Sequence, residues 1–173
     1  MPGANLVPTR RAPGARMPIR NPLSPAQRQE YEMTELPPAF QWPSARLMDA
    51  RIVSYDEDDQ TVEMTFTLPP EFAAMRGTAQ GGLLAGPIDE AFGAAVYLAT
   101  GGKLQLSLDI TMSFLRPVAM GKISVKARAV KAGRRISFLE AELFDAGVKL
   151  CVRATATSMA TEWPGQPKGE GEG

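Results

Sequence analysis

The sequence of 173 residues contains no histidine. Histidine is the usual acid and base near neutral pH and the commonest metal ligand. Its absence excludes serine–histidine triads, cysteine–histidine dyads, histidine-based dehydratases and histidine-ligated zinc sites. If the protein carries out acid–base chemistry, carboxylates are the side chains expected to do it.

Cysteine is almost as scarce, since Cys151 is the single one in the chain. One thiol can form neither an intrachain disulfide nor a cysteine-rich metal site, which fits a reducing compartment and predicts a cytoplasmic protein. Cys151 has no activating neighbour in sequence. It falls on the outward face of a predicted strand, and we interpret it as inert.

The chain also lacks an excess of charge of either sign. Nineteen lysines and arginines balance nineteen aspartates and glutamates. Because no net field draws the protein to nucleic acid or to an anionic membrane, we expect neither as a partner. A hydrophobic fraction of 44% and a charged fraction of 22% predict one globular domain that buries its own core.

Proline and arginine are concentrated near the amino terminus. Residues 1–43 hold nine of the fifteen prolines, and five arginines come before the first acidic residue, Glu30. This composition predicts a mostly flexible extension, with a short helix over 25–33 that starts at a Ser-Pro pair. The glycine-rich residues 161–173 predict a flexible tail. The folded domain is therefore expected over residues 44–160.

Between these ends, apolar and polar residues alternate in the manner of strands with one buried face. The alternation over 61–68 predicts a strand that forms a hairpin with an earlier partner at about 46–54. A longer alternation covers 103–114 and places Ser107 and Asp109 among its polar, outward positions. Three further strands are expected at about 122–129, 135–144 and 148–157.

The connections among the last four strands are short, so that part of the sheet is expected to be antiparallel. The strand at about 135–144 changes phase near Phe138 and Leu139. Such a change of phase predicts a bulge at this position.

A segment without this alternation separates the second predicted strand from the third. Residues 82–100 are apolar on nearly every face of a helix, and Asp89 and Glu90 are their only charges. A membrane span is disfavoured because a charged residue near its centre costs about 2.5–3.5 kcal/mol. The expected fold belongs to the α+β class: one long central helix wrapped by a curved antiparallel sheet of about five to six strands.

Gly81 and Gly82 stand where this helix begins. Consecutive glycine N–H groups at the positive end of a helix can polarise a carbonyl or hold an oxyanion, but glycine pairs before helices are also simple turns. Asp89 is either a buried carboxylate used as a base or an acid on an exposed helix edge beside Glu90. Gly81 and Asp89 lie about 12 Å apart along one helix axis, so they can act on one carbonyl only from different subunits of a two-fold dimer.

The order strand–strand–helix–four strands, the segment 77–83 with Asp89 downstream, and the segments 109–111 and 114–118 resemble the hotdog-fold acyl-CoA thioesterases. The resemblance is greatest to the phenylacetyl-CoA and 4-hydroxybenzoyl-CoA branch and covers about residues 46–160. It implies that two protomers pair into one continuous sheet, as a dimer or a dimer of dimers. It also implies hydrolysis of an acyl or aryl thioester, with coenzyme A as part of the substrate and no separate cofactor or metal.

The resemblance implies roles for individual residues. Gly81, followed by Gly82, matches the glycine pair whose N–H polarises the thioester carbonyl. Asp89 matches the acid that serves as general base or nucleophile. Ser107 falls near the place where some members use a hydroxyl to hold the water or the substrate.

Two positions depart from the family pattern. Gln80 replaces the motif histidine; it can still hydrogen-bond, but it cannot carry a proton. Ala74 lies six residues before Gln80, where asparagine or glutamine is usual in the family. Its side chain can neither form a hydrogen bond nor carry a proton. A catalytically silent hotdog protein that binds an acyl thioester is therefore the alternative to an enzyme. A hotdog hydratase is disfavoured, because such members generally use histidine.

Coenzyme A carries phosphates, which basic side chains bind. Exposed lysines and arginines are also the ordinary covering of the wet face of a sheet. The candidates for phosphate binding are Arg116, Lys126, Arg128, Lys131, Arg134 and Arg135.

Overall fold

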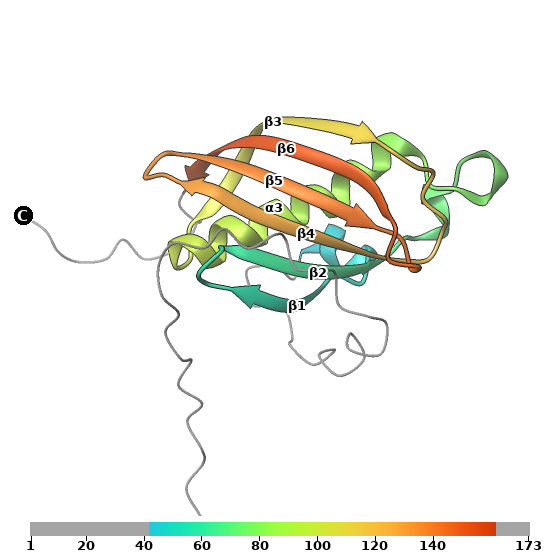
Figure 1. Cartoon of the computed structure of the whole chain (residues 1–173), viewed down its shortest axis with the longest axis horizontal. Coiled ribbons are helices and arrows are strands. Elements are labelled where there is room, and N and C mark those ends of the chain that lie inside the picture. Colours follow the sequence, from blue (N-terminus) through green and yellow to red (C-terminus); the bar gives the residue numbers. More distant parts are fainter. Residues whose placement is uncertain (1–41, 162–173) are drawn as a thin grey trace, which may run out of the picture.

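Alternating apolar and polar residues form a six-stranded antiparallel sheet in the computed structural model, which describes residues 42–161 (Figure 1). The strands lie in the order β1-β2-β4-β5-β6-β3, so β1 and β3 are the edges of the sheet. Their bounds are β1 (Arg51–Asp56), β2 (Thr61–Thr67), β3 (Leu104–Phe114), β4 (Lys122–Ala132), β5 (Ile136–Phe144) and β6 (Leu150–Thr161). Apart from positions 42, 43 and 161, the predicted extension, its short helix and the predicted tail lie outside the described residues.

The predicted central helix consists of a short 3-10 turn, η4 (Gly81–Leu84), followed by α3 (Ala85–Thr100). Pro87 lies in the first turn of α3, where its missing N–H breaks no intrahelical hydrogen bond. Figure 1 shows α3 lying along one face of the curved sheet, which confirms the predicted α+β architecture. Within the described part of the chain, no helix is long and apolar enough to cross a membrane.

The core lies between α3 and the face of the sheet that it covers. Alternate residues of β2 and β4 point into this core, and so do the apolar side chains of α3. Burial of each larger apolar side chain contributes about 1.5–3 kcal/mol, so the sheet and the helix stabilise each other. The fully buried larger side chains include Val62, Met64, Phe66, Ile88, Phe92, Val96, Ile123 and Val125.

The hairpin of β1 and β2 is confirmed, but the prediction that its first strand begins near Arg46 is wrong. Arg46 lies in a short helix, α2 (Pro43–Leu47), because Pro43 occupies the first turn with its φ already set for a helix. Asp49 has a left-handed φ of 45° and turns the chain away from α2. The strand then starts at Arg51.

Glu90 fastens α2 to α3. Its Oε2 atom accepts a hydrogen bond from Trp42 Nε1 at 3.0 Å, and its Oε1 atom accepts one from Ser44 Oγ at 2.6 Å. The adjacent carboxylates of α3 are therefore used differently, because Glu90 holds a neighbouring helix in place while Asp89 makes neither contact.

The prediction of a bulge near Phe138 and Leu139 in β5 is wrong, because Ile136–Leu143 pair one by one with β6, and the extra residue lies on the neighbouring strand β4. Ala129 pairs with Leu139 and Lys131 pairs with Phe138, so Val130 of β4 has no partner in the β4–β5 register. The residues of β5 keep one regular alternation through this region, and the apparent change of phase in the sequence comes from Phe138, an apolar side chain that is 48% exposed on the outer face.

The placement of Cys151 on the outward face of its strand is wrong. Leu143 pairs with Val152 and Phe144 pairs with Leu150, so Cys151 is the extra residue of a bulge in β6, and it is fully buried. Burial raises the pKa of the Cys151 thiol, and the nearby charge of Asp145 raises it further. An inert thiol remains the prediction, with burial as its physical basis.

We expect Cys151 to react with iodoacetamide at pH 8 at least about a hundredfold more slowly than free cysteine, because only an accessible thiolate attacks the reagent. Mass spectrometry of timed samples would measure this rate. In denaturant the rate should rise to that of free cysteine. Modification of the folded protein at the rate of free cysteine would contradict the buried position.

Candidate active site

The chain enters η4 through Gln80, whose side chain caps the turn. Gln80 Oε1 accepts a hydrogen bond from Leu83 N–H at 2.9 Å, and Gln80 N–H donates to the carbonyl of Phe72 at 2.8 Å. The N–H groups of Gly81 and Gly82 come first in the turn and have no partner among residues 42–161. Two adjacent donors thus stand free at the beginning of the long helix.

Glycine at both positions allows other groups to approach the free amides closely. A Cβ atom at Gly81 would lie 3.2 Å from Cε1 and Cζ of Phe114, and one at Gly82 would lie 3.1 Å from Gln80 Oε1. The ring of Phe114, at the end of β3, therefore lies against Gly81. Phe114 was not among the predicted site residues, because nothing in the sequence pairs a strand end with a helix start.

The loop before Gln80 is held by main-chain hydrogen bonds. Ala74 N–H donates to the carbonyl of Thr78 at 2.7 Å, and Ala79 N–H donates to that of Val118 at 2.8 Å. Arg76 and Gly77 have left-handed φ values of 65° and 71° at the tip of the loop. Ala74 therefore takes part through its backbone, and its side chain is exposed.

Asp89 is half-buried on α3 and is hydrogen-bonded to β3. Ser107 Oγ donates to Asp89 Oδ1 at 2.5 Å. The exposure of Asp89 is thus intermediate between the two alternatives considered from the sequence, a buried base and an acid on an exposed helix edge. Its second oxygen has no hydrogen-bond partner among the described residues.

A bulge in β3 explains why Ser107 reaches Asp89. Ser107 pairs with Ser158 and Asp109 pairs with Thr157, so Leu108 is an extra residue. The predicted uninterrupted alternation over 103–114, with Ser107 and Asp109 on one outward face, is therefore wrong. The bulge turns Ser107 toward α3 and leaves Asp109 on the outer face. An alternation of apolar and polar letters continues unchanged through the bulge, so periodicity alone gives no signal of it.

The structure keeps the glycine amides and Asp89 apart within one chain. Four residues of η4 at about 2.0 Å each and four of α3 at about 1.5 Å each separate Gly81 from Asp89 by about 14 Å along the helix. This separation exceeds hydrogen-bond reach to one carbonyl group. One chain therefore holds two halves of the predicted site that do not meet.

The basic residues predicted to bind phosphate are not gathered in one place. Arg116 Nη1 donates to the carbonyl of Leu150 at 2.6 Å, and Lys126 Nζ lies 3.6 Å from Glu63 Oε2. Lys131 and Arg134 are exposed near the turn between β4 and β5. Arg135 is exposed there too.

Arg128 is ion-paired on the face of the sheet opposite α3. Arg128 Nη1 lies 3.1 Å from Asp59 Oδ1, and its Nη2 atom pairs with Glu140. Burial opposes the charge of Arg128, but the hydrogen bonds and charges of Asp59 and Glu140 outweigh it, so its pKa is raised. These ion pairs already occupy the guanidinium that was predicted to bind phosphate.

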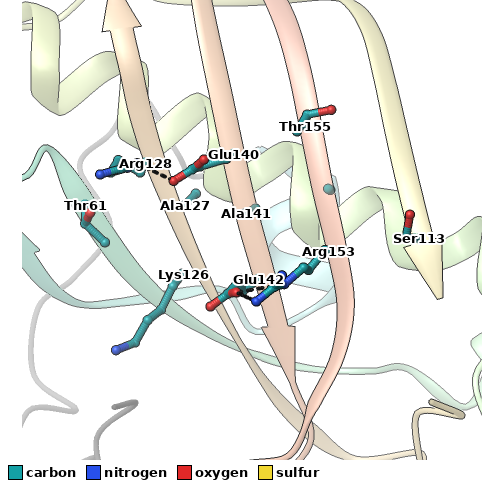
Figure 2. A pocket seen from close by; sticks show the side chains of 11 residues that line it. Thr61, Ser113, Lys126, Ala127, Arg128, Glu140, Ala141, Glu142, Arg153 and Thr155 are labelled. Carbon is teal, nitrogen blue, oxygen red and sulfur yellow. Dashed lines mark hydrogen bonds and ion pairs between the residues drawn. The ribbon is translucent and has the colours of Figure 1, made fainter. Parts of the chain in front are cut away.

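A groove of about 310 Å³ also lies on this outer face (Figure 2). It is bordered by the Arg128–Glu140 pair and by the Arg153–Glu142 pair, whose N···O distance is 3.0 Å. Neither Gly81 nor Asp89 lines it. The groove is therefore separate from the predicted chemistry, which lies on the helix side of the sheet.

Three solved structures show the fold that this chain shares. A phenylacetic acid degradation-related protein from Ralstonia eutropha is 28% identical, with 72% of this chain and 92% of that one covered and a TM-score of 0.63. A thioesterase from Haemophilus influenzae is 22% identical, with 76% and 94% covered and a TM-score of 0.64. The PaaI protein from the phenylacetic acid degradation operon of Escherichia coli is 21% identical, with 70% and 86% covered and a TM-score of 0.63.

The sequence profile of the thioesterase superfamily matches residues 76–152. This range begins in the loop before the glycine pair, contains Asp89 and Ser107, and ends in β6. It therefore includes both halves of the predicted site. Together with the observed architecture, the match confirms the resemblance predicted from the sequence: residues 76–152 are similar to the thioesterase superfamily, and the described part of the chain has a hotdog fold.

Proposed function

We propose that this protein hydrolyses acyl-CoA thioesters at sites shared between two protomers. In each site, Gly81 of one protomer binds the thioester carbonyl, and Asp89 of the partner subunit acts as general base or nucleophile. The observation that carries the proposal is the pair of amides at Gly81 and Gly82, which have no partner among residues 42–161, combined with an Asp89 carboxylate that is anchored within the same residues only through Ser107. Both groups are available for chemistry, and neither is consumed by holding the fold together.

The free amides suit the charge that develops during thioester hydrolysis. When water attacks the carbonyl carbon, the carbonyl oxygen becomes negative, and N–H donors fixed in advance stabilise that charge. Gln80 adds a further donor, because Leu83 N–H occupies its Oε1 atom and leaves the Nε2 amide group free among the described residues. Gln80 would thus supply the hydrogen bond of the missing histidine, without its proton transfer.

Asp89 would act on the opposite side of the carbonyl. As a general base it takes one proton from the attacking water, whose oxygen forms the new bond to carbon. Collapse of the tetrahedral intermediate then breaks the carbon–sulfur bond and releases the coenzyme A thiolate, which takes up the proton. Ser107 orients the carboxylate for this step through the hydrogen bond to Oδ1.

The free edge of β3 supports a shared site. β3 is eleven residues long, pairs only with β6 among the described strands, and carries Leu106 and Leu108 with more than half of each side chain exposed. A long apolar edge strand is an aggregation liability unless another strand covers it. Pairing of β3 with its two-fold copy would cover this edge, continue the sheet and bring a second chain beside Ser107 and Asp89.

The substrate is proposed to be an aryl or other acyl thioester of coenzyme A. Two of the structurally similar proteins are named for phenylacetic acid degradation, which places aryl thioesters first among the compounds to test. Lys131 and Arg134 are the exposed cations proposed to bind the phosphates of coenzyme A. We expect no cofactor beyond the coenzyme A of the substrate, and a cytoplasmic location.

Asp89→Asn should reduce thioesterase activity about 10²- to 10⁴-fold, because the amide cannot accept the proton from water. Release of free thiol from a panel of aryl, short, medium and long acyl-CoAs would measure kcat/KM for both proteins. Glu90→Gln is the matched control, since it alters the adjacent carboxylate, which binds Trp42 and Ser44. It should retain the activity of the unmodified protein.

Equal activity in the Asp89→Asn variant would exclude Asp89 from the mechanism. Tight binding of an acyl-CoA by the unmodified protein without release of thiol would instead support the silent binding protein. That alternative is favoured by the role of Gln80, which is held as a helix cap and carries no transferable proton.

Leu108→Asp should convert a dimer into monomers at micromolar concentration and abolish activity with it, because each β3 edge would then present a charge to its copy. Analytical ultracentrifugation would measure the mass, and thiol release the activity. Val130→Asp is the matched control, since Val130 is equally exposed at 55% but lies on β4, away from the edge. The control should stay dimeric, and a fully active monomer of Leu108→Asp would refute the shared site.

A further inference from the structure

Three serines lie in one row across the last three strands of the sheet. Ser137 of β5 pairs with Ser158 of β6, and Ser158 pairs with Ser107 of β3. Paired residues of an antiparallel sheet point to the same side. Since Ser107 reaches Asp89 on α3, all three hydroxyls lie on the helix side of the sheet.

Two of these hydroxyls are buried without a partner. Ser137 and Ser158 are both 0% exposed, and neither Oγ atom has a hydrogen-bond partner among the described residues. Gln105, two residues before Ser107 on β3, adds a buried Oε1 atom that is also unpaired. A buried hydroxyl without a partner costs about 1–3 kcal/mol, so a group of such atoms in one place calls for a common partner.

The spacing of the row fits bridging by water. Adjacent strands lie about 4.8 Å apart, which is too far for a direct bond between hydroxyls carried in the same orientation. One water molecule between two hydroxyls spans about 5.5 Å with two hydrogen bonds of ordinary length. Each gap in the row therefore suits a single water.

Three alanines lie beside the row on the helix side of the sheet. Ala156 and Ala160, which flank Ser158 on the same side of β6, pair with Ile110 and Gln105 of β3. Ala132 of β4 pairs with Ser137. A site for buried water needs space as well as two or more polar partners, and alanine fills less of the volume beside the row than a larger apolar side chain would.

We propose that Ser137, Ser158 and Ser107 form a binding site for a row of ordered water molecules that ends at Asp89. The waters bridge the three hydroxyls, and the hydrogen bond from Ser107 to Asp89 connects them to the carboxylate. One end is open, because Ser107 is exposed on the edge strand, and the other is closed within the core. The inference rests on the proposed function only for the role given to Asp89.

In this arrangement Ser158 is a positioning residue. Hydrogen bonds in a chain polarise one another, so water held by Ser158 strengthens the bond from Ser107 to the carboxylate. Without that water, Ser107 has no fixed partner on its far side and holds Asp89 less firmly. The effect should fall on the chemical step, because Ser158 is fully buried and does not touch the substrate.

Ser158→Ala tests the row. We expect kcat on the best thioester to fall about tenfold and KM to stay unchanged. A tenfold fall is the change expected when one hydrogen bond of the network is lost. The Tm should fall too, because Ser107 and Ser137 lose their bridging waters. A crystal structure of the unmodified protein should show water between the three hydroxyls.

Ser124→Ala is the matched control. Ser124 is also 0% exposed and unpaired among the described residues, but it alternates with the inward residues Ile123 and Val125 and so lies on the opposite face of the sheet. Its removal should leave kcat unchanged and the Tm unchanged or raised, as for an unsatisfied hydroxyl. The row is refuted if Ser158→Ala behaves like this control.

A double-mutant cycle in Tm separates this inference from the proposed function. If Ser107 and Ser158 are coupled through water, the Tm shift of the double variant Ser107→Ala/Ser158→Ala is smaller than the sum of the two single shifts. Coupled shifts in a protein without turnover would support the row and reject the thioesterase. Additive shifts in an active enzyme that requires Asp89 would reject the row and keep the thioesterase.

Discussion

The enclosure of α3 by a single curved sheet is the constraint on which the rest of the structure depends. A helix that is apolar on nearly every face must be covered almost completely, and one sheet can cover only part of it. Its two charged residues lie where that cover ends. Glu90 is bonded to α2, and Asp89 is bonded to the edge strand β3. The helix thus places a carboxylate at the free edge of the sheet.

The lack of histidine gives this carboxylate a larger share of the proposed chemistry. No imidazole is present to receive the proton of water and return it to the leaving group. A thiolate is a good leaving group and needs little protonation as it departs, so a site with one carboxylate and fixed amide donors is sufficient for a thioester. The same site would serve poorly for an amide, whose leaving nitrogen must be protonated.

Periodicity predicted the fold well because each element buries one regular face. The helix, the hairpin and the four later strands follow directly from spacing, and Gly81 and Asp89 were predicted as site residues because a glycine pair and a lone carboxylate are unusual in an apolar segment. The bulges at Leu108, Val130 and Cys151 changed which side chains face inward. Each inserts an apolar residue into an apolar pattern, and the contact of Phe114 with Gly81 depends on tertiary packing, so neither feature leaves a local signal.

The bulge in β3 also bears on how this sequence can evolve. Substitutions along the strand change one side chain at a time, whereas loss of Leu108 would restore a regular alternation and exchange the faces of every residue before it. Ser107 would then point away from α3, and Leu106 would take its side. Descendants of this protein can therefore accept substitutions in β3. The number of β3 residues before Asp109 is under selection wherever Asp89 is used, because an insertion or deletion there would move Ser107 away from α3.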